Sequence, residues 1–105
     1  MDRDEAGEDS MIGIIVRHLA RPEAESAGLE LIQTAGRAMK SFPGFRSRYV
    51  MVSQTEKNQI STVTIWDSRE DYVRWVESDV NRAIVRPPNV WISRPEPTFF
   101  DVLPE

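Results

Sequence analysis

The sequence predicts one small α+β domain, with four strands and two helices in the order strand, helix, strand, strand, helix, strand. Two observations carry this prediction: short β-branched runs alternate with apolar stripes at helical spacing, and proline or glycine pairs follow both stripes. The chain has 105 residues, which is the usual size of a single domain. Its 40% of apolar and 29% of charged residues are ordinary for a globular protein.

The first strand is predicted over residues 11–19, which are rich in β-branched side chains. Alternation along a strand places Ile12, Ile14, Val16 and His18 on one face and Ile15, Arg17 and Leu19 on the other. Both faces are mostly apolar, so we expect both of them to be covered by other parts of the protein.

The first helix is expected to begin at Pro22, because proline suits the first helical turn. Small and apolar residues then recur at spacings of three and four as far as Phe42. Pro43-Gly44 follows directly and predicts the end of the helix.

A hairpin is predicted next, with strands over residues 45–54 and 59–66. On the first of these strands, Arg46 and Arg48 are expected to share one face. That face either holds a carboxylate or sulfate, or is solvated or ion-paired to an acidic residue across a dimer.

The second helix is predicted to start after a cap at Asp67 or Ser68 and to stop at Pro87-Pro88. Its apolar stripe comprises Tyr72, Val76, Val80, Ala83 and Ile84. The last segment, residues 90–103, is expected to hold short strands at a sheet edge, because Pro95 and Pro97 lack amide donors.

This order of elements is that of the ferredoxin-like fold, in which two helices cover one face of a four-stranded antiparallel sheet. The other face of such a sheet is bare, and a bare apolar face is unfavourable in water. The last segment adds three aromatic side chains, Trp91, Phe99 and Phe100. We therefore predict a homodimer in which a second copy covers the bare face and closes a dimeric α+β barrel.

The net charge of -4 lies entirely in residues 1–10, which we expect to be a disordered acidic tail. The expected domain, residues 11–105, has equal numbers of acidic and basic side chains. A neutral body does not attract a phosphate backbone, so nucleic acid is not an expected partner. No apolar run is long enough to span a membrane, and the absence of cysteine fits a reducing compartment, so we expect a cytoplasmic protein.

Three short motifs occur in order along the chain. They are Phe42-Pro43-Gly44-Phe45 at the end of the first helix, Thr64-Ile65-Trp66-Asp67-Ser68 at the end of the hairpin, and Asp71-Tyr72-Val73-Arg74-Trp75-Val76-Glu77-Ser78 in the second helix. In their order and spacing, residues 11–103 resemble the antibiotic-biosynthesis monooxygenase family of the dimeric α+β barrel group. The resemblance implies a cofactor-independent monooxygenase that acts on a small aromatic or quinone-like compound.

Trp75 also matches the helix tryptophan that lies against the tetrapyrrole in the heme-degrading relatives. Those enzymes have a histidine ten residues later, where this chain has Val85, and an asparagine on the first strand, near Val16 or Arg17 here. The resemblance therefore disfavours heme degradation. It leaves three alternatives: a non-enzymatic module that binds a small hydrophobic or aromatic ligand, a heme-binding relative that lacks the heme-degrading residues, and an isomerase.

An enzyme of the resembled kind desolvates its substrate, favours the substrate anion and holds it near oxygen. We expect His18, Tyr72 and Trp75 to be catalytic, with His18 as the proton acceptor because it is the only histidine. Arg17, Tyr49 and Trp66 are expected to bind the substrate. The competing interpretation is structural: a solvated or core-capping histidine, and aromatic side chains that only pack in the core.

Other site classes have little support in the sequence. One histidine and no cysteine predict no metal site, and the glycines fit neither a phosphate loop nor a dinucleotide fingerprint. No nucleophile elbow is present. We expect neither a metal nor another cofactor.

Overall fold

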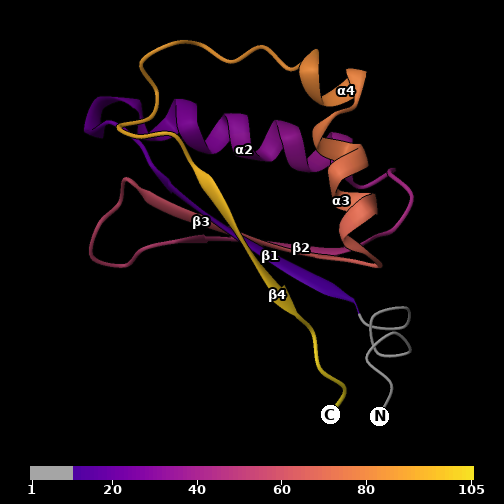
Figure 1. Cartoon of the computed structure of the whole chain (residues 1–105). Helices are drawn as coiled ribbons and strands as arrows, with labels where there is room; N and C mark the ends of the chain where they lie inside the picture. Colours follow the sequence, from indigo (N-terminus) through magenta and orange to yellow (C-terminus); the bar gives the residue numbers. More distant parts are fainter. Residues whose placement is uncertain (1–10) are drawn as a thin grey trace.

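The computed structural model describes residues 11–105, and the predicted acidic tail over residues 1–10 lies outside them. The described chain forms a four-stranded antiparallel sheet in the order β2-β3-β1-β4, with the helices on one face (Figure 1). The elements are β1 (Ile12–Leu19), a 3-10 turn (Pro22–Ala24), α2 (Glu25–Met39), β2 (Phe45–Val52), β3 (Gln59–Trp66), α3 (Arg69–Val76), α4 (Asp79–Arg82) and β4 (Glu96–Asp101). The predicted ferredoxin-like α+β fold is confirmed. No helix in this part of the chain is long and apolar enough to cross a membrane.

β1 and β3 are the two central strands, and β4 is an edge strand. On β3 every second residue is buried, because these side chains face the helices. Pro97 pairs with Val16 on the edge strand, where a missing amide donor is tolerated. The predicted edge position of this proline-containing segment is therefore confirmed.

The hydrophobic core lies between the helices and the sheet. Its buried residues are Ile12, Ile14, Met39, Trp66 and Trp75. Trp66 has no exposed surface, and its ring meets Phe45 and Tyr72 edge-on at centroid distances of 5.5 and 5.9 Å. Its indole Nε1 donates to Thr64 Oγ1 at 3.0 Å, so the one polar atom of this side chain is satisfied.

The predicted second helix is two short helices, because the chain changes direction at Ser78. Ser78 Oγ donates to the Trp75 carbonyl at 2.7 Å and accepts from the Asn81 amide at 3.0 Å. One side chain thus ends α3 and caps α4. The chain that follows α4 passes over α2 on its way to β4 (Figure 1), and Trp91 in this segment forms an isolated bridge with Ala20.

The turn after α2 depends on Gly44, which has a φ of +87°. The side chain of Asp71 occupies the space that a Cβ atom at this position would need. Both the backbone conformation and the close approach of α3 therefore require glycine here. This contact sets the distance between the end of α2 and the start of α3.

Candidate active site

A pocket of about 450 Å³ lies between the helices and the sheet. β1 and β3 form its floor with Val16, Thr62 and Thr64, and α2 forms a wall with Ile32, Ala35 and Met39. The segment after α4 contributes Trp91 and Pro95. The pocket thus has both apolar and polar walls and lies within the helix-covered half of the domain.

His18, Tyr72 and Trp75 all line this pocket, although they come from different elements. His18 is near the end of β1, on its helix-facing side, while Tyr72 and Trp75 are one turn apart on α3. Trp75 is only 4% exposed, and Phe42 packs against it edge-on. The structure therefore brings together the three residues that the sequence suggested for catalysis.

Arg17, Tyr49 and Trp66 do not line this pocket. Arg17 is exposed on the opposite face of β1, and Tyr49 is 62% exposed on the same far face of the sheet. Trp66 is enclosed in the core, which agrees with the interpretation that this side chain only packs there. Strand alternation separates Arg17 from His18, so the two side chains do not reach one cavity.

The ring of His18 has a defined hydrogen-bonding state. Its Nδ1 lies 3.2 Å from the carbonyl oxygen of Ile60, and because a carbonyl only accepts, Nδ1 carries the proton and donates it. In the neutral ring, Nε2 is then an acceptor. Burial lowers the pKa of His18, and the positive charge of Arg48 adds to this effect. The neutral imidazole, which is the form that can take up a proton, is favoured at neutral pH.

Two aromatic residues, Trp91 and Tyr72, line the same pocket as the histidine. The ring of Trp91 lies 5.0 Å from that of His18, centroid to centroid. Burial raises the pKa of the Tyr72 hydroxyl, so this group remains protonated at neutral pH and can donate a hydrogen bond. The sequence suggested Trp91 only as part of a dimer contact, because nothing local indicates that its segment crosses back to β1.

Arg48 lines the pocket, whereas the sequence predicted only that it shares a strand face with Arg46. A bulge between Phe45 and Ser47 shifts the register of β2, which turns Arg48 toward the helices and into the pocket. Arg46 remains exposed and pairs with the carboxylate of Asp67 at 2.5 Å. The prediction that Arg46 and Arg48 share a face is therefore wrong, because it assumed regular alternation through the bulge.

The guanidinium of Arg48 rests against α2. Its Nη2 donates to the Ile32 carbonyl at 2.7 Å, while its Nε is buried without a hydrogen-bond partner. A Cβ atom at Gly36 would overlap with this guanidinium. Burial lowers the pKa of Arg48, although an arginine remains charged at neutral pH.

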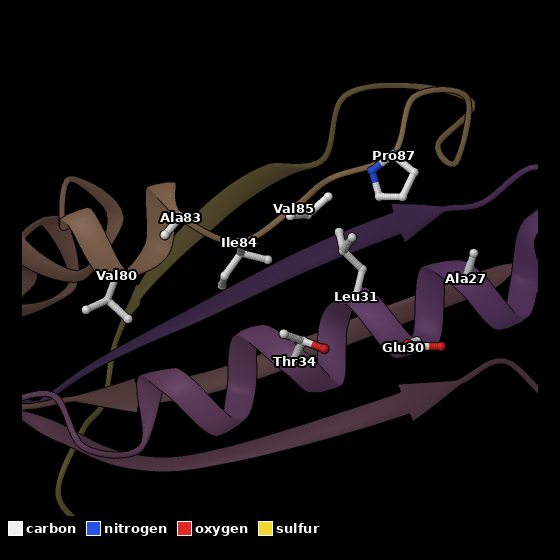
Figure 2. A pocket seen from close by; sticks show the side chains of 9 residues that line it. All are labelled: Ala27, Glu30, Leu31, Thr34, Val80, Ala83, Ile84, Val85 and Pro87. Atoms are coloured by element: carbon white, nitrogen blue, oxygen red, sulfur yellow. The ribbon is translucent and has the colours of Figure 1, made fainter.

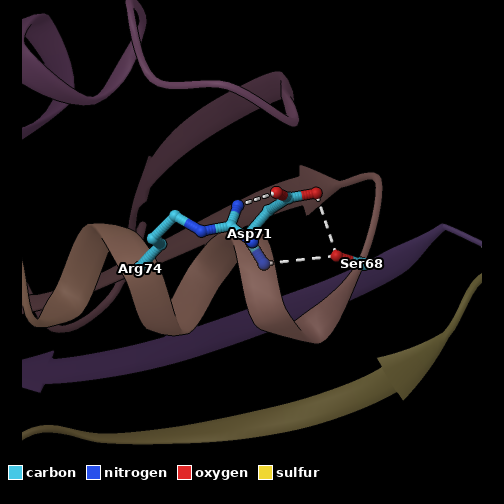
Figure 3. Close-up of polar contacts among 3 residues, drawn as sticks. All are labelled: Ser68, Asp71 and Arg74. Atoms are coloured by element: carbon cyan, nitrogen blue, oxygen red, sulfur yellow. Dashed lines mark hydrogen bonds and ion pairs between the residues drawn. The ribbon is translucent and has the colours of Figure 1, made fainter.

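The first turn of α3 is fixed by three polar side chains (Figure 3). Ser68 Oγ accepts from the Asp71 amide at 3.2 Å and donates to Asp71 Oδ2 at 2.9 Å. Arg74 Nη1 donates to the other carboxylate oxygen, Oδ1, at 2.5 Å. This cap holds the helix that carries Tyr72 and Trp75 into the pocket.

A second pocket, of about 610 Å³, lies on the outer side of α2 (Figure 2). Figure 2 shows Ala27, Leu31 and Thr34 of α2 on one side and Ile84, Val85 and Pro87 on the other. Of its described lining residues, Glu30 alone has a titratable side chain, so these residues offer no acid–base pair. Among residues 11–105, no three His, Cys, Asp or Glu side chains are grouped so that they could hold a metal ion. We therefore place the candidate site in the pocket of His18.

Comparison with family models gives one match, to the antibiotic biosynthesis monooxygenase family, over residues 11–87. This is well over half of the chain. The chain belongs to the antibiotic biosynthesis monooxygenase family. The family resemblance of the sequence motifs is thereby confirmed. No curated protein matches the chain.

Solved structures share the fold of this family member at low sequence identity. Rv0793 from Mycobacterium tuberculosis is 19% identical with a TM-score of 0.77, and the match covers 91% of this chain and 98% of that one. A conserved protein from Methanosarcina mazei is 12% identical with a TM-score of 0.77, covering 92% and 96%. SnoaB, a cofactor-independent oxygenase from Streptomyces nogalater, is 12% identical with a TM-score of 0.73, covering 91% and 96%. These likenesses show the fold.

Proposed function

We propose that this protein is a cofactor-independent monooxygenase that oxidises a small phenol to a quinone in the pocket of His18. The observation that carries the proposal is a half-buried, neutral imidazole whose Nδ1 donates to a backbone carbonyl, in a pocket with aromatic side chains in its wall. SnoaB, which has the same fold, is a cofactor-independent oxygenase. Membership of a monooxygenase family supports the same reaction class.

The reaction begins when His18 Nε2 takes the proton of the substrate hydroxyl. The phenolate donates electrons to O₂, and a C–O bond forms at a para carbon that carries hydrogen. The histidine returns its proton to the resulting peroxide. Loss of the ring hydrogen then breaks the O–O bond, and hydroxide leaves with a proton as water. Overall, one phenol and one O₂ give one para-quinone and one water, so the substrate supplies all the electrons.

The remaining pocket residues have supporting parts in this reaction. The protonated hydroxyl of Tyr72 donates a hydrogen bond to the substrate oxygen, and Trp75 forms a flat wall for the ring. The apolar side chains of α2 exclude water, which strengthens the interactions of the substrate anion. The protein thus orients the substrate and controls its protonation, while O₂ reacts with the substrate itself.

Oxygen uptake by the purified protein tests the proposal. A panel of phenols and 1-naphthols with a free para position is expected to consume O₂ in a ratio of roughly one to one with substrate, without added flavin, heme or metal. With ¹⁸O₂, one labelled atom enters the quinone and the other enters water. Absence of enzyme-dependent uptake across the whole panel contradicts the proposal.

The proposal includes a homodimer in the cytoplasm. The sheet face opposite the helices exposes large apolar side chains, among them Tyr49 at 62%, Met51 at 50% and Phe100 at 47%. Half-buried Ile15, Val63 and Ile65 lie between them on the same face. A continuous apolar surface of this kind is unusual on a monomer, and a second copy would cover it. Arg17 and Tyr49 would then lie inside the barrel, where they could still bind a substrate.

Substitution of a charged residue on this face is expected to break the dimer. Val63→Glu places a carboxylate at the centre of the far face, and its desolvation on association is unfavourable. We expect wild type to sediment as a dimer at micromolar concentration and Val63→Glu to sediment as a monomer. Gln33→Glu, on the exposed side of α2, is the matched control and is expected to remain dimeric. A wild-type protein that stays monomeric at high concentration rules out the dimer.

A further inference from the structure

We propose that the ligand of the helix-side pocket is an aromatic carboxylate, and that Arg48 binds its carboxylate group. This inference rests on the proposed function only for the reaction that follows binding. It assigns a substrate class, a hydroxyarene carboxylate, and a binding role for a residue that regular strand alternation would place on the opposite face.

Arg48 has hydrogen-bonding capacity that the protein does not use. Its one hydrogen bond goes to the carbonyl of Ile32, which lies inside α2 four residues before Gly36 and so has a partner within the helix. If the Arg48 side chain moves away, this carbonyl therefore keeps its hydrogen bond within the helix. The buried Nε has no acceptor among residues 11–105, which is an unfavourable state for a charged donor. A ligand that offers acceptor oxygens removes this deficit.

The backbone of α2 is shaped to hold the guanidinium. Gly36 is buried in the middle of the helix, where glycine is less favourable than alanine. A methyl group at this position would collide with the guanidinium of Arg48. The helix is thus less stable than it would be with alanine at the position where Arg48 rests. This indicates that the position is adapted to accommodate the guanidinium.

The charges around the pocket are all positive. Its described lining residues include three arginines, Arg48, Arg86 and Arg94, and no acidic side chain. Arg86 is tied to the end of α4 by bonds to Asn81 Oδ1 and to the carbonyls of Asn81 and Ile84. In contrast to Arg46 and Arg74, each of which pairs with an aspartate, Arg48 forms no ion pair within the described chain. An anionic ligand supplies the missing counter-charge.

The residues that line the pocket favour a carboxylate on an aromatic ring as the anion. A planar guanidinium matches the two oxygens of a carboxylate, and arginine is favoured for such recognition. The aromatic walls at Trp75 and Trp91 accommodate a flat ring system. With the carboxylate at Arg48, the ring lies between these walls, and a hydroxyl on it can approach His18.

Calorimetric titration with a matched pair of probes tests the inference. 2-Naphthoate and 2-naphthamide have nearly the same shape and differ in charge. Wild type is expected to bind 2-naphthoate about tenfold or more tightly than 2-naphthamide, as for a hydrogen bond to a charged group in a partly buried site. Equal affinity of the wild-type protein for the two probes overturns the proposal, and this comparison needs no variant.

Two variants test whether Arg48 causes the preference for 2-naphthoate over 2-naphthamide. Arg48→Met keeps an unbranched side chain but removes the guanidinium and its charge, so the preference for 2-naphthoate is expected to fall to within about twofold. Arg46→Met, on the exposed side of the same strand, is the matched control and is expected to keep the full preference. If Arg48→Met does not fold, Arg48→Gln takes its place. A folded neutral variant at position 48 that still prefers 2-naphthoate overturns the role of Arg48.

The outcomes separate this inference from the proposed oxygenase activity. Oxygen uptake with neutral naphthols, together with equal binding of the two probes, supports the oxygenase activity and contradicts the carboxylate site. The converse result is a preference for 2-naphthoate that depends on Arg48, without oxygen uptake from any hydroxynaphthalene or hydroxynaphthoate. It supports the carboxylate site and contradicts the oxygenase activity.

Discussion

His18→Gln is expected to reduce turnover by about 10²–10⁴-fold, the usual contribution of a general base. The glutamine amide can still donate to the carbonyl of Ile60, as His18 Nδ1 does, so the strand contact is preserved. It cannot take up a proton, and the substrate hydroxyl then loses its acceptor. Initial rates of oxygen uptake at saturating substrate measure this effect.

The pH dependence of the wild-type enzyme provides a second test of the same residue. The active form of His18 is the neutral one, and its pKa in the folded protein lies below the ordinary value of 6.5. Activity should therefore persist as the pH falls through 6.5 and disappear only at more acidic pH, where the ring becomes protonated. A folded His18→Gln protein should lack this acidic limb in its residual activity.

The control for this substitution is Arg37→Gln on the exposed side of α2. Arg37 bonds only to Thr34 and lies outside the pocket, so its replacement should leave the rate unchanged. If His18→Gln folds and retains a rate within about twofold of wild type, another group accepts the proton and His18 is not the base.

Trp66→Ala is expected to lower the free energy of unfolding by about 3–5 kcal/mol. Trp66 is completely buried at the end of β3, so its truncation leaves a cavity between Phe45 and Tyr72. A domain has a total stability of only about 5–15 kcal/mol, so the variant should be close to unfolding at ambient temperature. Urea denaturation followed by far-ultraviolet circular dichroism, at one fixed protein concentration, gives the difference.

Trp66→Phe is the graded control. It keeps most of the ring volume but loses the bond from the indole Nε1 to Thr64, so a loss of about 1–2 kcal/mol is expected. Similar losses in the alanine and phenylalanine variants would mean that the hydrogen bond, and not the packing, is the main contribution of Trp66. A loss below about 1 kcal/mol in Trp66→Ala contradicts the burial of this side chain.

Local sequence signals predicted most of the fold. The spacing of small and apolar residues correctly predicted α2, but the α-helix spans Glu25–Met39, so it begins three residues after Pro22 and ends three residues before Phe42. Ser78 followed directly by Asp79 has the residue types of a helix cap and an acidic first turn. Continuous helical spacing from Tyr72 to Ile84 concealed this break, because periodicity alone does not detect a change of helix axis.

The candidate site was predicted in part. His18, Tyr72 and Trp75 are assigned to one side of a strand and one side of a helix by alternation and helical spacing, and these assignments were sufficient to bring them together. The place of Arg48 in the pocket was not predicted, because the bulge at Arg46 reverses every side chain after it on β2. The place of Trp91 was not predicted either, because this residue lies in a segment without regular structure, whose path depends on the end of α4.

The sequence by itself determined which segments become strands and helices, their order, and hence the four-stranded sheet with helices on one face. These features follow from local spacing, since each element is defined by residues within a few positions of one another. Only the tertiary structure decided that Arg48 enters the pocket and that Trp91 packs on His18. Both depend on register and chain path, which are set by contacts between residues far apart in the sequence, where a shift of one residue exchanges the two faces of a strand.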